Sequence, residues 1–254
     1  MIISKIKKIS EHIELHVFDL VDLTPEIIDQ IDANIVEICE GHSGTDIGLV
    51  KSIFLNFLQS KDYKSQIGSV AEFFVHLYLR QSGFKQEFLF FNLEEGALKK
   101  GFDGLFSHEN EKYLVESKSG LDSTTGISHK RKLKEAYDDI SSVISGDGKK
   151  SKNNPWKNAY NHASHIDVNT EKSIRKKIKN LSDGFDKGNF NKIEEFNVVP
   201  CSSIFITKDW NDEISGQIFL VENSFFENFK SKSVKAVCVT KATYKSFFEY
   251  LGAK

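Results

Sequence analysis

The 254-residue sequence is poor in cysteine and has no long hydrophobic run. Its three cysteines, Cys39, Cys201 and Cys238, lie far apart, and no CxxC pair or Cys/His spacing typical of a zinc site occurs. An odd cysteine count without a signal peptide favours a reducing compartment, so we expect a cytoplasmic protein. No apolar stretch approaches the roughly 20 residues that a membrane-spanning helix needs, so we expect no membrane association.

The sequence also lacks a strong net charge, which is -2 at pH 7. Its charges are nevertheless unevenly placed. Residues 1–50 hold ten acidic residues against three lysines, and residues 128–180 hold thirteen lysines and arginines against six acidic residues. This asymmetry predicts an acidic N-terminal section and a basic surface elsewhere on the protein.

Local patterns in the N-terminal part predict one strand followed by helices. Residues 12–18 alternate apolar and polar side chains, as in a strand; His12, Glu14 and His16 on its polar side suggest either a metal site or, as we favour, a solvated face. Helices are expected over 25–39, 47–58 and 64–81. We divide the chain into an acidic, mostly helical section (1–60) and a domain over 61–254.

The remainder alternates predicted strands and helices, which indicates an α/β fold. Strands are expected at 87–92, 198–207, 217–221 and 234–239, and helices at 128–145, 171–181 and 242–251. Residues 146–160 have the composition of a flexible basic linker. The early part of the 128–145 helix carries Lys130, Arg131, Lys132 and Lys134, and we expect these four side chains to contact DNA.

The stretch 101–120 reads as two short strands joined by a polar turn. The first strand carries Asp103, and the second ends in Glu116-Ser117-Lys118. Because strand side chains alternate between faces, Glu116 and Lys118 share one face, and the hairpin brings Asp103 near them. Glu72 lies at the edge of the apolar stripe of the 64–81 helix. It is either a solvated helix charge or a third acid pointing into this site.

These residue types suit phosphodiester hydrolysis. Two or three carboxylates from different elements can hold Mg²⁺, with Mn²⁺ as a possible substitute, and a lysine can offset the charge that develops in the transition state. We therefore take Asp103, Glu116 and Lys118 as candidate catalytic residues. The candidate metal ligands are Glu72, Asp103 and Glu116. The competing interpretation is an exposed hairpin with an ordinary Glu–Lys pair.

Three short motifs carry a resemblance to a known family. They are G-x-x-x-E at 68–72, G-F-D-G at 101–104 and L-V-E-S-K at 114–118. Over about residues 64–145 the chain resembles the PD-(D/E)xK nuclease superfamily, which has the restriction-endonuclease-like fold. Phe102 stands where that superfamily often has proline. The arrangement is also similar to the HamA-type nuclease subunits of Hachiman anti-phage defence systems.

The resemblance implies a restriction-endonuclease-like core, in which a central mixed β-sheet is flanked by helices. It implies a Mg²⁺-dependent deoxyribonuclease in which Asp103 and Glu116 bind the metal, helped by Glu72, and Lys118 is the catalytic lysine. It further implies a HamB-type helicase partner that restrains the nuclease. Two alternatives stay open: a non-catalytic nucleic-acid-binding or regulatory module on the same fold, and a stand-alone restriction or repair endonuclease.

Overall fold

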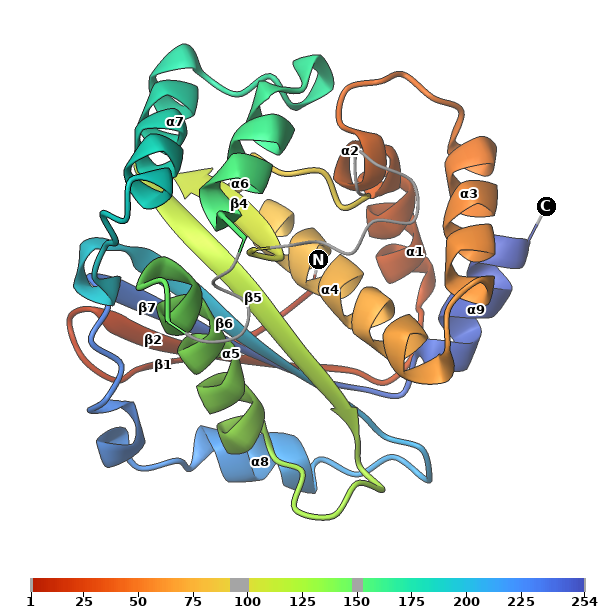
Figure 1. Cartoon of the computed structure of the whole chain (residues 1–254). Helices are drawn as coiled ribbons and strands as arrows, with labels where there is room; N and C mark the ends of the chain where they lie inside the picture. The colour runs from red at the N-terminus through yellow and green to blue at the C-terminus, as the bar shows by residue number, and fades with distance from the viewer. Residues whose placement is uncertain (1, 92–100, 148–152, 254) are drawn as a thin grey trace.

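The computed structural model describes residues 2–91, 101–147 and 153–253. Within these ranges seven strands form one mixed sheet, in the order β1-β2-β7-β6-β5-β4-β3 (Figure 1). Strands β2, β7, β6 and β5 are parallel, and β1, β4 and β3 are antiparallel to their neighbours. The strands are β1 (Lys5–Lys8), β2 (Ile13–Leu20), β3 (Lys85–Gln86), β4 (Gly104–His108), β5 (Glu111–Leu121), β6 (Asn197–Phe205) and β7 (Ser233–Lys241).

Helices cover both faces of the sheet, which confirms the predicted α/β class with a central mixed sheet. One hydrophobic core takes its helical side chains from α1 (Pro25–Asp32), α2 (Ile35–Glu40), α3 (Ile47–Gln59), α4 (Tyr63–Gln81) and α9 (Tyr244–Gly252). The other takes them from α5 (His129–Ile144), α6 (Pro155–Ser164), α7 (Lys172–Asp186) and α8 (Glu213–Phe219). On β5, Tyr113 and Val115 belong to the first core and Leu114 to the second, as strand alternation requires. No helix in the described part of the chain is both long and apolar enough to cross a membrane.

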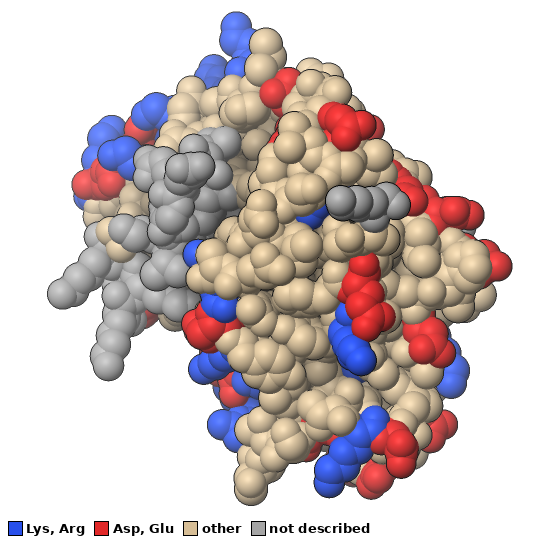
Figure 2. Space-filling view, turned by 90° about the vertical axis from the view of Figure 1, so that its right-hand side faces the viewer, with Lys and Arg blue, Asp and Glu red and all other residues tan. Residues whose placement is uncertain are grey.

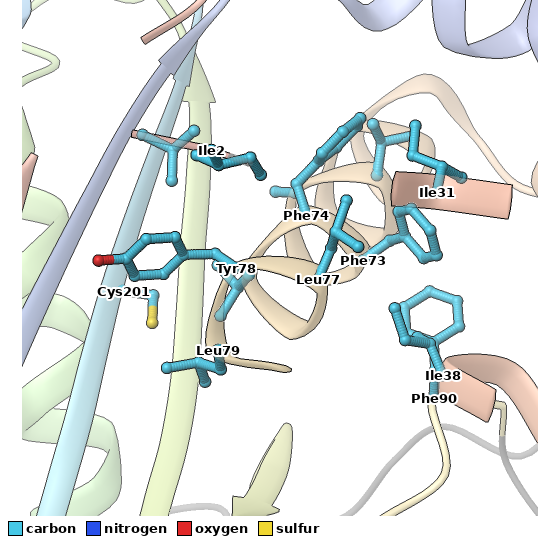
Figure 3. Close-up of a cluster of buried hydrophobic side chains, with 14 of the residues drawn as sticks. Ile2, Ile31, Ile38, Phe73, Phe74, Leu77, Tyr78, Leu79, Phe90 and Cys201 are labelled. Atoms are coloured by element: carbon cyan, nitrogen blue, oxygen red, sulfur yellow. The ribbon is translucent and has the colours of Figure 1, made fainter. Parts of the chain in front are cut away.

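Helix α4 is the centre of the first core. It begins at Asp62, whose side chain accepts a hydrogen bond from the Ser65 amide at 3.1 Å and so caps the helix. Its second half is buried on all sides, because the sheet lies against one side and α2 and α3 against another. Figure 3 shows Phe73 on the side of the helix away from the sheet, whereas Tyr78 points towards Cys201 on β6. The helix predicted over 64–81 is confirmed.

The N-terminal section shares the sheet and the first core with the rest of the chain. Strand β2 pairs in parallel with β7 from Ile13 to Leu20, and helices α1 to α3 pack in the same core as α4. The boundary expected at residue 60 therefore lies inside a shared core. The single helix predicted over 25–39 is interrupted at residues 33–34, so α1 and α2 are separate.

The prediction that His16 lies on a solvated strand face is wrong. Strand β2 is an inner strand, and α4 covers the face that its polar residues occupy. His16 is 9% exposed, and its Nδ1 lies 2.7 Å from the Tyr78 hydroxyl oxygen. Glu14 accepts a hydrogen bond from Lys235 at 2.6 Å. This short polar pattern serves to join β2 to α4 and β7.

Two predicted strands are wrong. Residues 217–221 lie mostly in helix α8, which packs Ile218 against the sheet. Residues 88–91 are not in a strand, and residue 92 lies outside the described residues. Strand β3 covers Lys85–Gln86, and the Glu87 amide bonds to the Leu105 carbonyl oxygen of β4 at 2.8 Å. The Phe90 amide instead bonds to the Ile38 carbonyl oxygen of α2 at 2.9 Å. In both places a short apolar run has no strand partner in the described chain, and a short apolar run alone does not distinguish helix, strand and loop.

The predicted linker over 146–160 is helical at its end. Helix α6 begins at Pro155 and is capped by Asn154, whose Oδ1 accepts from the Trp156 amide at 3.0 Å. Trp156 is buried against Phe102 and Phe196, so this segment is part of the second core. Residues 148–152 of the predicted linker lie outside the described residues.

Candidate functional site

The candidate site lies where β5 extends beyond β4. Pairing of these strands ends at Gly104 and Val115, whereas β5 continues to Leu121 beside β6. Within the described chain, the last six residues of β5 therefore have a strand partner on one side only. We call this the open edge of β5, residues 116–121. Such an edge leaves backbone groups available for side chains or a ligand.

Asp103 caps the start of this open edge. It lies directly before β4 rather than within it, and its amide donates to the Val115 carbonyl oxygen at 3.1 Å. Its Oδ2 accepts a hydrogen bond from the Ser117 amide at 2.8 Å. The two contacts hold the Asp103 carboxylate beside the backbone between Glu116 and Lys118. The predicted approach of Asp103 to the second strand is confirmed by these hydrogen bonds.

Glu116 and Lys118 point to the face of the sheet that α5 covers. Glu116 is 5% exposed, and Lys118 Nζ donates to its Oε1 at 2.6 Å. Lys118 Nζ also lies 2.8 Å from Oδ2 of Asp139 on α5. Sequence reasoning missed Asp139. Asp139 lies at the edge of the apolar stripe that Leu133, Ala136 and Ile140 form on α5. A carboxylate at the edge of an apolar helix stripe is the same pattern that identified Glu72 as a candidate.

The surrounding charges keep Lys118 protonated. Burial alone would lower the pKa of its ammonium group. The attraction of Glu116, the hydrogen bonds to Asp139 and Glu116, and the charge of Asp103 outweigh burial and raise the pKa above its ordinary value. Lys118 therefore supplies a positive charge at neutral pH.

Glu72 reaches this region from the opposite side of the sheet. A side chain at Gly68 would lie 3.9 Å from the Ser119 hydroxyl oxygen, and one at Gly104 would lie 3.5 Å from His76 Nε2. Helical spacing places Glu72 between these contacts, above the open edge of β5. Its Oε1 lies 3.7 Å from His76 Nε2. Glu72 is thus on the α4 side of β5, whereas Glu116 and Lys118 are on the α5 side.

Glu72, Asp103 and Glu116 are the candidate ligands for a divalent cation. The described residues include no group of three or more His, Cys, Asp or Glu side chains that could hold a metal ion. The structure thus does not assemble Glu72, Asp103 and Glu116 into one ligand group. Asp103 and Glu116 nevertheless meet at the open edge, and both charges act on Lys118. Two carboxylates suit Mg²⁺, which keeps several waters and often binds through one or two carboxylates.

The basic residues expected to contact DNA lie on the first two turns of α5. Lys130, Arg131 and Lys134 are exposed and line a surface hollow of about 490 Å³ together with Phe225. Lys132 is largely covered: its side chain is 18% exposed and passes close to Gly120 of β5. Acidic residues on the same helix pair with three of these cations. Glu135 pairs with Arg131 and Lys132, and Asp138 pairs with Lys134. The local positive charge is therefore smaller than the sequence suggests.

His129 fixes the beginning of α5 on the sheet. Its Nδ1 lies 2.8 Å from the Ser202 hydroxyl oxygen and its Nε2 lies 3.0 Å from the Thr240 hydroxyl oxygen. Full burial lowers the pKa of His129 to about 3, so the ring is neutral at physiological pH. Because the ring is neutral, one of its nitrogens donates a hydrogen bond and the other accepts one. The ring joins α5 to β6 and β7 beside the site.

Comparison with family models and with curated proteins identifies no match for this chain. The functional assignment therefore depends on the residues and geometry of the site.

Proposed function

We propose that this chain is a metal-dependent DNA nuclease that hydrolyses phosphodiester bonds with Asp103, Glu116 and Lys118. One observation carries the proposal: Asp103, directly before β4, and Glu116 and Lys118 of β5 meet at the open edge of β5, with the ammonium held among carboxylates. An ordinary exposed Glu–Lys pair would have no reason to bury Glu116 or to hold a further carboxylate on the Ser117 amide.

In this proposal each residue has one role. Asp103 and Glu116 hold Mg²⁺, or Mn²⁺ in its place, and the bound ion would polarise a phosphoryl oxygen and lower the pKa of a bound water. The Ser117 amide orients Asp103 by its hydrogen bond. Lys118 places a permanent positive charge where negative charge develops on the phosphoryl group, which favours the transition state. Glu72 approaches from the α4 side and is a further ligand only if the site closes around a metal.

DNA would approach along α5, since Lys130, Arg131 and Lys134 are exposed on the helix that also carries Asp139. The role in anti-phage defence and the HamB-type helicase partner rest on the resemblance of the three motifs. In this proposal the partner binds the acidic N-terminal section, residues 1–60. On the face shown in Figure 2, acidic side chains are more frequent towards the right-hand side and basic ones towards the left and lower edges.

The non-catalytic alternative predicts that the purified protein does not cut DNA and that the site residues can be exchanged without consequence for DNA binding. The arrangement around Lys118 favours the enzyme, because a module that only binds DNA gains nothing from burying Glu116 at 5% exposure beside a paired lysine. A stand-alone restriction or repair endonuclease would use the same chemistry. A neighbouring helicase gene supports the defence subunit, and a neighbouring methyltransferase gene supports restriction.

The test is degradation of plasmid DNA by the purified protein with Mg²⁺, with Mn²⁺ and with EDTA, each with and without any helicase encoded beside it. Glu116→Gln and Lys118→Ala are compared with Lys112→Ala, a matched change at a half-buried lysine on the same strand. We expect metal-dependent cutting that both site variants lose and Lys112→Ala keeps. Cutting that survives both site variants, or no cutting under any condition, would contradict the nuclease.

A further inference from the structure

We propose that Asp139 is a positioning residue for Lys118: its carboxylate holds the ammonium at the open edge of β5 from a second element, α5. The catalytic consequence rests on the proposed nuclease function, whereas the contact itself does not. No motif in the sequence marks Asp139, and it lies outside the three motifs of the resemblance.

The contact is a two-sided clamp on one nitrogen. Lys118 Nζ lies 2.6 Å from Glu116 Oε1 and 2.8 Å from Asp139 Oδ2. Glu116 lies on the same strand, two residues away, whereas Asp139 comes from the helix above. The side chains of Glu116, Lys118 and Asp139 are 6%, 23% and 33% exposed. The clamp thus lies at the border between the core and solvent, where a phosphate group can reach the ammonium.

The position of Asp139 is imposed by the packing of α5. Leu133 and Ile140 of this helix are fully buried in the second core. At its beginning, His129 bonds to Ser202, which is the β6 residue paired in register with Lys118. Further along, the Tyr137 hydroxyl accepts from the Ser231 amide at 3.2 Å. The helix therefore keeps a fixed place above β5, and Asp139 keeps its place above Lys118.

A second anchor matters because Glu116 has two roles in the proposed reaction. A cation held by Glu116 and Asp103 competes with Lys118 for the Glu116 carboxylate, and it repels the ammonium because both charges are positive. With Glu116 alone, Lys118 would then turn towards solvent. The Asp139 carboxylate, from another element, attracts the ammonium independently of Glu116 and keeps it near the reacting phosphoryl group.

The adjacent acid provides a matched control. Asp138 lies on the outer face of α5, where it pairs with the exposed Lys134 at 2.6 Å and its own side chain is 55% exposed. Asp138→Asn and Asp139→Asn make the same chemical change, one residue apart, on the same helix. A general effect of lost helix charge would appear in both variants, whereas an effect on Lys118 would appear only in Asp139→Asn.

The first measurement needs neither metal nor DNA. Wild type, Asp138→Asn, Asp139→Asn and Asp139→Glu are treated with acetic anhydride in EDTA, and acetylation of Lys118 is followed by peptide mass spectrometry relative to Lys112. We expect Lys118 to react about fivefold faster in Asp139→Asn, since a charge-assisted hydrogen bond is lost at a partly exposed site. Asp138→Asn should match wild type, and Asp139→Glu should restore most of the protection.

The second measurement is steady-state cutting of plasmid DNA in Mg²⁺. We expect Asp139→Asn to lower kcat about tenfold with KM for DNA nearly unchanged, because the lost interaction is one made at the reacting group. Unchanged acetylation of Lys118 in Asp139→Asn, an equal rise in Asp138→Asn, or a change in KM alone would overturn the proposal. If wild type cuts no DNA, the nuclease proposal fails, and the acetylation result still decides whether Asp139 anchors Lys118.

Discussion

Replacing Asp103 by asparagine separates its structural contact from its chemical role. The carboxylate accepts a hydrogen bond from the Ser117 amide at 2.8 Å. An asparagine side chain has a similar shape and can still accept this hydrogen bond through its amide oxygen. It lacks the negative charge that a divalent cation and Lys118 require. Asp103→Asn should therefore keep the fold of the open edge and remove the chemistry.

The expected magnitudes follow from this hydrogen bond. A bond to a charged acceptor contributes about 1.5–3 kcal/mol to the free energy of unfolding, and a neutral one about 0.5–1.5 kcal/mol. Asp103→Asn should thus cost about 1 kcal/mol. Asp103→Ala leaves the Ser117 amide without its acceptor and should cost about 2–3 kcal/mol. Loss of a charged ligand should lower the rate of Mg²⁺-dependent cutting by about 100-fold or more in both variants.

The assay pairs urea unfolding with cutting rates over a range of Mg²⁺ concentrations. Asp122→Asn is the matched control, because Asp122 lies just beyond the far end of β5 and accepts from the Thr207 amide at 3.1 Å. The stability of Asp122→Asn should change by about as much as that of Asp103→Asn, while its cutting rate stays that of wild type. Wild-type cutting by Asp103→Asn would refute the ligand role. Equal destabilisation by asparagine and alanine at residue 103 would refute the role of the hydrogen bond.

Two further predictions concern lysines. Lys241 is fully buried, with Nζ 4.4 Å from the centroid of a phenylalanine ring, and burial lowers its pKa well below 10.5. The unfolded chain binds this proton more readily, so stability should rise with pH up to the unfolded pKa near 10.4. Urea unfolding should show that Lys241→Met is more stable than wild type at pH 7 and that its stability does not rise with pH. Lys245→Met, at an exposed lysine, should keep the rise. A rise that persists in Lys241→Met would contradict its assignment to Lys241. Replacing Lys130, Arg131 and Lys134 by glutamate should weaken DNA binding. The slope of log binding constant against log salt concentration should fall by about one unit per lost phosphate contact. Both are measured by fluorescence anisotropy in EDTA, with Lys245→Glu as control. An unchanged slope would place the DNA elsewhere.

The neutral state of Lys241 follows from a comparison of two energies. Attraction of an ammonium to aromatic rings contributes about 2 kcal/mol in a desolvated site. Removing an unpaired ammonium from water costs several kcal/mol even after relaxation. The cost exceeds the attraction, and Lys241 Nζ has no hydrogen-bond partner within the described structure. Burial therefore favours the uncharged amine over the ammonium at Lys241.

Where local patterns carried the information, the sequence predicted the structure well. The helix over 64–81, the hairpin at 101–120 and the strand over 12–18 were predicted from periodicity and turn residues, and each is present with small shifts in its ends. Residues 217–221 were misassigned because a run of five residues, four of them apolar, fits a strand or a short helix equally well. Contact with β2, which is far away in sequence, and with β7 selects the helix.

The sequence by itself determined that Glu116 and Lys118 share a face, because alternation along a strand is a property of the backbone. It also determined the α/β class, through the order of its periodic segments. Only the tertiary structure decided that α5 covers that face, that α4 carries Glu72 to the other one, and that Asp139 reaches Lys118. These depend on how helices pack across the sheet, and packing is set by side chains distant in the chain that no local pattern relates to one another.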